Sequence, residues 1–343
     1  MGQRFAIGDQ HVECSNRPDD FSGEICCRLP IETVRALSQR DRLRSSGQML
    51  WEWGMILAAA WLCAQYWHPL GYVLTVMWIG ARQHALAILM HDGAHYLLLR
   101  SKRWNDVITE VFLAWPIFIT MRAYRQTHWA HHRAPNTEQD PDWIRKQNSE
   151  WQFPKSGREL AAILLKDASS LHTYQQLMEI ITLSGQSGQK PPRWYQTAWG
   201  AFYALIAVGL TLWHGWNAFL LYWIVPSLTW LKVILRIRSI AEHFCFIEFA
   251  SNQDLTLART TLPSWWERVF VAPNHINYHL DHHLYPSVPF YRLPQLHEAL
   301  LRTTGYAQKA HLTTTYWGVL RECVLGTPQR PSSATQTPTS TPA

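Results

Sequence analysis

Two long stretches of this 343-residue chain are nearly free of charged residues. Residues 45–81 hold no Lys or Arg and a single acid, Glu52, and residues 194–231 hold no charged residue. A short polar or turn-forming segment interrupts each stretch near its middle, at residues 66–71 and 214–217. A membrane-spanning helix needs ~17–25 residues. Each stretch therefore predicts a helical hairpin that crosses a membrane and returns.

The expected spanning helices cover approximately residues 49–66, 70–90, 196–213 and 217–235. A large soluble helical protein with two buried hairpins is the alternative, but charge-free runs of this length are rare in soluble helices. The pattern thus predicts an all-α integral membrane protein with four transmembrane helices in two hairpins and a cytosolic helical cap. We divide the chain into a cytosolic N-terminal segment (1–44), a membrane domain (45–310) and a C-terminal segment (311–343). The Pro-, Ser- and Thr-rich part of this last segment, from about residue 327, is expected to be disordered.

The distribution of basic residues predicts the topology. All 31 Lys and Arg lie outside the two hairpin turns. Because cytoplasmic loops are enriched in Lys and Arg, both termini and residues 82–193 are expected in the cytoplasm. The formal net charge of +6 fits an anionic membrane surface rather than nucleic acid, since the basic residues flank apolar stretches.

Histidine is the candidate chemistry. Eight of the 17 histidines fall in three clusters, at residues 91–95, 128–132 and 279–283, at or beyond the ends of long apolar stretches. Residues at i, i+3 and i+4 share one face of a helix, so each cluster can direct two or three imidazoles at one point. This arrangement predicts a metal site.

The order of the clusters resembles that of a known superfamily. His-Asp-x-x-His at 91–95, His-x-x-His-His at 128–132, and a second His-x-x-His-His at 279–283 after another hairpin look like the histidine boxes of the integral-membrane fatty acid desaturases and hydroxylases. The likeness runs from about residue 51 to 297 and includes the flanking segments 135–142 and 277–286. Acyl desaturases, alkane hydroxylases and carotenoid ketolases share this order of boxes.

The resemblance implies a non-haem di-iron (Fe²⁺) centre that uses O₂ as co-substrate, with a further ligand after the last membrane helix. His243 occupies that position. Ser239 stands where some relatives have an Asn, so that ligand is not carried over, and His275 stays open as an extra donor. No catalytic residue beyond the ligands is expected. The implied metal ligands are His91, His95, His128, His131, His132, His243, His279, His282 and His283.

The donor set agrees with this chemistry. Nine imidazoles shared by two irons give four or five nitrogens each and leave positions for a bridging oxygen and O₂. Zinc would favour four ligands with Cys or carboxylate among them, and it has no redox chemistry. About three of the five nearby acids are expected to accept the far ring N–H of ligands and to orient them. The candidates are Asp92, Asp140, Asp142, Glu242 and Asp281.

We therefore expect an O₂-dependent acyl-lipid desaturase that introduces a C=C bond, in the inner or plasma membrane of a bacterium. Its substrate would be a lipid or acyl chain in the membrane. A di-iron hydroxylase or ketolase acting on a lipid, alkane or carotenoid is the alternative within the superfamily, and a histidine-rich metal carrier is the alternative from another class. The chain lacks the Gly-x-Gly-x-x-Gly motif of nucleotide cofactors. Electrons would thus come from an external donor protein, ferredoxin-like or similar.

Overall fold

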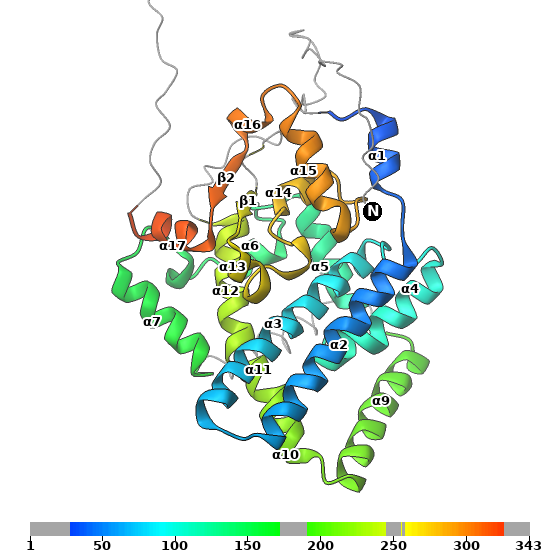
Figure 1. Ribbon diagram of the computed structural model, residues 1–343. Helices are drawn as coiled ribbons and strands as arrows, with labels where there is room; N and C mark the ends of the chain where they lie inside the picture. The colour runs from blue at the N-terminus through cyan, green and yellow to red at the C-terminus, as the bar shows by residue number, and fades with distance from the viewer. Residues whose placement is uncertain (1–27, 172–190, 245–254, 256–257, 326–343) are drawn as a thin grey trace, which may run out of the picture.

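The computed structural model describes residues 28–171, 191–244, 255 and 258–325, and this part of the chain is almost entirely helical (Figure 1). Two short strands, β1 (Arg259–Leu262) and β2 (His311–Thr314), pair in parallel. The long helices lie together, and the shorter elements gather at one end of them. The first 27 residues and the expected disordered tail lie outside the described residues.

The first long stretch forms an antiparallel hairpin of α2 (Arg42–Gln65) and α3 (Pro69–Ala94). Asp41 caps α2 by accepting the backbone N–H groups of Leu43 and Arg44. His68 caps α3, and Pro69 occupies the first helical position, where its missing N–H costs nothing. Both helices extend several residues beyond the predicted ranges at the end away from their shared turn.

The single acid of this stretch is buried in an ion pair between the two helices. Glu52 accepts a hydrogen bond from the Arg82 guanidinium at 3.0 Å and another from Gln48 at 2.7 Å. An unpaired charge at this depth would be costly, whereas a hydrogen-bonded pair is tolerated. The pair fixes α2 against α3.

The second stretch forms α9 (Arg193–Leu212), a turn at residues 213–215, and a long rod. This rod covers Trp216–His243 and consists of α10 (Trp216–Phe219), a π-helical turn η4 (Leu220–Ile224), α11 (Val225–Leu228) and α12 (Trp230–His243). It extends eight residues beyond the predicted end at 235. This extension carries His243 to the same end of the molecule as the end of α3.

Among the described residues, two helices are long and apolar enough to cross a membrane, Pro69–Ala94 and Trp216–His243. A third candidate is a pair bent by 92°, Lys102–Ile117 and Met121–Arg133. Its parts are α4 (Lys102–Thr109), η1 (Glu110–Ala114), η2 (Trp115–Ile117) and α5 (Met121–Arg133). By this measure α2 and α9, which begin with charged or polar turns, do not qualify, so the four-span arrangement stays a prediction.

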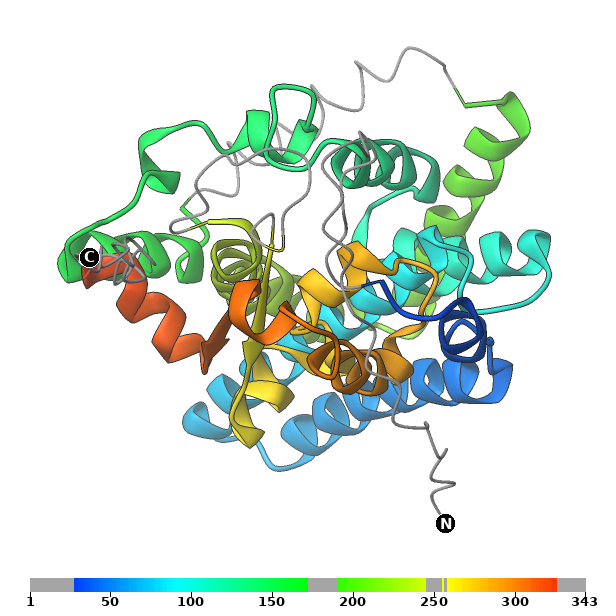
Figure 2. The same ribbon diagram turned by 90° about the horizontal axis from the view of Figure 1, so that it is seen from above.

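Most of the remaining elements form a cap over one end of the hairpins, opposite the two hairpin turns (Figures 1 and 2). Apolar residues of α12 and α17, such as Ile240 and Val319, join one core, and Leu280 of α14 and Leu296 of α15 join another. The cap comprises α1 (Ile31–Leu37), α6 (Pro141–Arg145), η3 (Ser149–Trp151), α13 (Trp265–Phe270), η5 (Pro273–His275), α14 (His279–Leu284), η6 (Phe290–Arg292), α15 (Leu293–Leu301), α16 (Tyr306–Lys309), α17 (Tyr316–Leu325) and the two strands. Helix α7 (Gly157–Ala168) lies along the side of the rod, and Ser170 just after it donates to the Leu228 carbonyl of α11. Residues 311–325 belong to this cap, because β2 pairs with β1.

Candidate metal centre

The nine histidines singled out by the sequence converge in two groups. Within each group, one nitrogen from every ring lies within 4.8 Å of the others. The five-histidine group contains His91, His95, His128, His132 and His282, and the four-histidine group contains His131, His243, His279 and His283.

Helix geometry explains this division. Successive residues of an α-helix point about 100° apart, whereas residues at i and i+4 nearly overlap. On α5, His128 and His132 therefore face the five-histidine group, while His131 turns to the other group. On α14 the i, i+4 pair His279 and His283 serves the four-histidine group, and the intervening His282 serves the five-histidine group.

The end of α3, which carries His91 and His95, is anchored by contacts of Gly93. The carbonyl of Gly93 accepts hydrogen bonds from Asn105 at 2.8 Å and from Arg125 at 3.3 Å. A Cβ at position 93 would collide with the Thr109 side chain. A glycine is thus required here for α3 and α4 to approach closely, which fixes the direction of His91 and His95.

The spacing of the ring nitrogens fits shared metal ions. The Nε2 atoms of His95 and His128 lie 2.8 Å apart, those of His243 and His279 2.8 Å, and those of His283 and His279 3.0 Å. Two nitrogens bound at right angles to one ion, each about 2.1 Å from it, are separated by about 3.0 Å. Among the described residues, neither ring nitrogen of buried His91 has a hydrogen-bond partner, as expected of a group whose partner is a metal.

The surroundings of several of these imidazoles favour the neutral form, which is the form that binds metal. Burial lowers the pKa of His95 to about 4, and Arg125 adds to the effect. Burial also lowers the pKa of His282 and of His283 well below the usual value, and the neighbouring histidines lower it further. Protonating one ring beside several others would place like charges together in a desolvated site.

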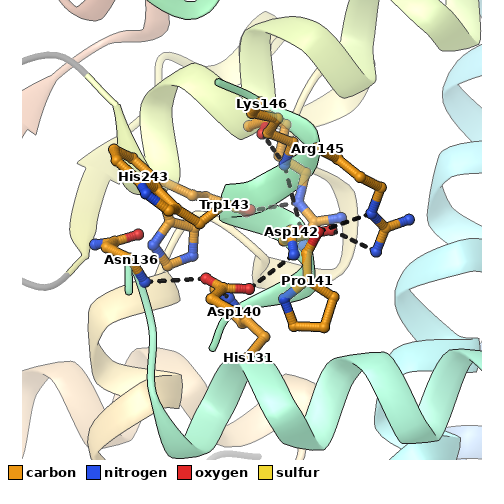
Figure 3. Close-up of polar contacts among 12 residues, drawn as sticks. His131, Asn136, Asp140, Pro141, Asp142, Trp143, Arg145, Lys146 and His243 are labelled. Atoms are coloured by element: carbon orange, nitrogen blue, oxygen red, sulfur yellow. Dashed lines mark hydrogen bonds and ion pairs between the residues drawn. The ribbon is translucent and has the colours of Figure 1, made fainter. Parts of the chain in front are cut away.

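Asp140, one of the five candidate acids, bonds directly to a member of the set. Its Oδ2 lies 2.8 Å from Nδ1 of His131, and the carboxylate also accepts the backbone N–H groups of Asn136 and Asp142 (Figure 3). Burial raises the pKa of Asp140, but these hydrogen bonds outweigh it and hold the pKa below the usual value. The ionised carboxylate can thus fix the His131 ring so that Nε2 faces the four-histidine group.

Two further acids lie close to members of the set. Oδ1 of Asp92 is 3.6 Å from Nδ1 of His91, and Oε1 of Glu242 is 3.6 Å from Nδ1 of His279. Both distances are too long for a hydrogen bond. Each acid has another partner: Asp92 accepts the Phe290 N–H at 2.9 Å, and Glu242 accepts from Arg238. At these distances neither acid orients a ring of the set.

The other two candidate acids, Asp281 and Asp142, pair with groups outside the nine histidines. The buried carboxylate of Asp281 accepts hydrogen bonds from His297 at 2.9 Å, Tyr306 at 3.1 Å and Thr260, and none of the described hydrogen bonds joins it to the nine histidines. It points away because α14 turns its face toward α15 and β1. Asp142 pairs with Arg145 and Lys146 instead. Sequence spacing gave no signal for His297, since it lies in no cluster.

The remaining histidine candidates lie outside both groups. His275 falls in η5 beside Tyr278, with 6.3 Å between the ring centroids, and it is not a member of either group. Burial lowers its pKa to about 4. His84 is buried within α3, with its Nε2 3.5 Å from the Arg238 guanidinium. Ser239 accepts a hydrogen bond from Lys146 at 2.7 Å.

Two cavities open onto the histidines. The first, which we call the α6–α12 cavity, has a volume of about 400 Å³ and is lined by members of both groups, by α6 and by the polar face of α12. The second has a volume of about 640 Å³ and is lined by His132, His283 and residues 133–139, apart from Asn136. The rings of His132 and His283 stack at a centroid distance of 4.3 Å, so one ring of each group faces this second cavity.

The sequence model of the fatty acid desaturase family matches residues 67–316, more than half of the chain, and this range includes all nine histidines. The chain belongs to the fatty acid desaturase family. As a member, it is an oxidoreductase, and it has helices able to span a membrane. A metal carrier, the alternative from another class, is not what this family comprises.

Three relatives illustrate the range of the desaturases to which the chain is similar. It is 30% identical to the dihydrorhizobitoxine desaturase of Bradyrhizobium elkanii, over 81% of this chain and 78% of the relative. It is 23% identical to a chloroplastic omega-6 fatty acid desaturase of Spinacia oleracea, over 73% of this chain and 56% of the relative. It is also 23% identical to an sn-1 acyl-lipid omega-3 desaturase (ferredoxin) of Nostoc sp., over 74% and 72%.

Proposed function

We propose that this protein is an O₂-dependent desaturase in which the nine histidines hold two non-haem irons. The observation that supports this most strongly is the convergence of nine ring nitrogens into adjacent groups of five and four. Such a donor set leaves coordination positions open on both ions. When bound, the iron pair supplies O₂ activation strong enough to remove hydrogen from an unactivated C–H bond.

The overall reaction balances with an external reductant. A CH₂–CH₂ unit, one O₂, two electrons and two protons give CH=CH and two waters. The chain has no nucleotide-cofactor motif, so the two electrons would come from a separate donor protein, ferredoxin-like or similar. The Nostoc relative, whose name includes ferredoxin, supports this class of donor. The second cavity, where His132 and His283 are only half-buried, offers a short route to both groups.

The chain's own residues would position the site and keep water out. Asp140 holds the His131 ring, and the Gly93 carbonyl contacts anchor the end of α3. Most of the nine rings are buried, and a dry site protects an oxidising reaction from side reactions with water. Each of these residues shapes the site before the reaction starts, and none is assigned a role in the reaction itself.

We further propose that both hairpins span the membrane, with the two termini and the metal centre on the cytoplasmic side. The hairpin turns lie at one end of the molecule and the cap with its basic residues at the other, which supports this orientation. The buried Glu52–Arg82 pair lets α2 accompany α3 through an apolar layer. Bacterial relatives support a bacterial inner or plasma membrane.

The names of the relatives agree on desaturation and differ in substrate. Two are named for fatty acids or acyl lipids, and the relative at 30% identity is not. An acyl chain as substrate therefore stays a prediction from the sequence.

Expression in a heterologous bacterium with a competent electron donor tests the reaction. Mass spectrometry of lipid and aqueous extracts should reveal a product two hydrogens lighter than its precursor. The product should be absent with His282→Ala and present with His214→Ala, which removes an exposed hairpin-turn histidine. A product heavier by one oxygen would instead establish the hydroxylase. If His282→Ala matched the wild type, the metal assignment would fail.

A further inference from the structure

The walls of the α6–α12 cavity are charged. Five cations line it, namely Arg145, Lys146, Lys232, Arg236 and Arg238, together with three acids, Asp142, Asp167 and Glu242. The floor is formed by rings of both histidine groups, including His91, His131 and His243. A molecule that fills this cavity contacts the cationic side chains and histidines of both groups together.

Two of the arginines are already matched to acids. Arg236 donates to Asp167 at 2.8 Å and to Glu150 at 3.0 Å, and Arg238 donates to Glu242. These are close, buried pairs. They contribute little attraction for a further anion.

At α6 the charges are not matched one to one, because the Asp142 carboxylate pairs with both Arg145 and Lys146. Its carboxylate lies 3.2 Å from Arg145 and 3.3 Å from Lys146 (Figure 3). Charge-assisted hydrogen bonds of full strength measure about 2.7–2.9 Å. Asp142 carries a single negative charge and shares it between these two cations. One positive charge remains for a ligand.

The position of the Lys146 ammonium is fixed by other contacts. It donates to the Ser239 hydroxyl at 2.7 Å and lies over the rings of Trp151 at 5.3 Å and Phe244 at 5.8 Å. An ammonium held in this way loses little freedom when an anion binds. Lys146 is thus already positioned to bind an anion, unlike a lysine whose ammonium is surrounded by solvent.

An uncharged alkyl chain fits this cavity poorly. To occupy it, such a chain would strip water from several charged groups and give no hydrogen bond in return, which is unfavourable for each of these groups. The more apolar hollow, of about 630 Å³ between η1, α5 and α9, is lined by residues such as Val111 and Trp115 and by none of the nine histidines. Its apolar walls therefore do not lead a chain to the metal centre.

We propose that the substrate is a small, water-soluble carboxylate whose carboxylate group binds Arg145 and Lys146 while its saturated carbons lie against the histidine floor. This proposal rests on the proposed desaturase function and names its substrate class. An Arg guanidinium and a Lys ammonium are the donors that a carboxylate prefers. The volume of about 400 Å³ lies at the small end of the ~300–1,000 Å³ range of ligand pockets.

The first experiment identifies the substrate fraction. Full-length protein in lipid nanodiscs, loaded with iron and supplied with a reduced donor, is incubated with extract of the source organism. The extract is divided into aqueous anionic, aqueous neutral and lipid fractions. The anionic fraction should yield a compound two hydrogens lighter, and the His131→Ala protein should yield none. Turnover of the lipid or the neutral fraction alone would overturn the carboxylate proposal and leave the desaturase function standing. Equal product from wild type and His131→Ala would reject the desaturase function itself.

The second experiment tests the two cations with the compound that the anionic fraction supplies. Arg145→Gln and Lys146→Met should each raise KM about 10–100-fold with kcat within about twofold, because a lost charge-assisted hydrogen bond weakens binding rather than chemistry. Lys146→Arg should restore most of the affinity. Arg158→Gln, at an exposed position on α7 outside the cavity, is the matched control and should change neither constant. Unchanged KM in both variants, with iron content and thermal stability retained, would overturn the assignment of these residues.

Discussion

His131 and His132 are neighbours in the chain, but their imidazoles belong to different histidine groups. Their ring centroids lie 5.9 Å apart with an interplanar angle of 78°. His282 and His283 divide in the same way, with centroids 6.1 Å apart. The second and third clusters therefore join the two groups, because adjacent helical residues point about 100° apart.

This division leads to a prediction about metal content. His131→Ala reduces the four-histidine group to three ligands, whereas His132→Ala leaves four in the other group. We expect both variants to lose turnover and His131→Ala to lose more iron, since fewer nitrogens remain to hold that ion. Iron per chain, measured by plasma mass spectrometry, gives the comparison. His214→Ala serves as the control, and unchanged iron in both cluster variants would contradict the ligand assignment.

The Asp140–His131 contact predicts a smaller effect. Asp140→Asn keeps the size of the side chain but removes the charge that favours Nδ1–H on His131. Loss of such a partner typically costs ~10–100-fold in metal affinity or activity. Glu298→Gln, at an exposed acid on α15 outside both cavities, should have little effect. Turnover and iron content are measured on the same preparations. If Asp140 acted only by stabilising the protein around the iron, both variants would retain full specific activity per iron.

The lowered pKa of His275 predicts that the stability of the folded protein changes with pH. Burial, with Arg268 adding to it, lowers its pKa to about 4, against about 6.5 in an unfolded chain. Between these values the unfolded state binds more protons, so this contribution is complete above pH 6.5 and is lost as the pH falls toward 4, by up to about 3 kcal/mol. His275→Asn tolerates the positive φ of 58° at this position. Thermal unfolding at pH 7 and 4.5 should show a smaller acid-induced loss in the variant, and equal losses would contradict the prediction.

The orientation in the membrane can be tested by labelling. Single cysteines at Ser101 and Gln147, both exposed on the cap side, should react only from the cytoplasmic side in a background without native cysteines. A cysteine at Asn217, at the hairpin-turn end, should react from outside. A membrane-impermeant thiol reagent on intact cells and on inverted vesicles distinguishes them. Reaction of Ser101→Cys and Asn217→Cys from the same side would exclude the four-span arrangement.

Hydrophobic pattern alone located the long helices. The predicted segments 49–66, 70–90 and 196–213 lie within two residues of α2, α3 and α9 at the turn ends, because a Pro or a Gly near each turn interrupts the helix. The far ends were less accurate. The rod continues past the predicted end at residue 235 as far as His243. Ile240 and Ala241 pack into a core shared with the cap, and this packing stabilises the added turns.

Spacing in the sequence picked out eight histidines in three clusters, because residues at i, i+3 and i+4 share one helix face, and the resemblance to the desaturases supplied His243. The division into groups of five and four could not be read from the sequence, since it depends on how α3, α5, α12 and α14 pack and are rotated about their axes. The tertiary structure likewise directed Asp140 to His131 and Asp281 to His297, although both acids stand near histidine clusters in the chain. A carboxylate bonds to the group that packing brings within about 3 Å, and neighbours in sequence do not fix that distance.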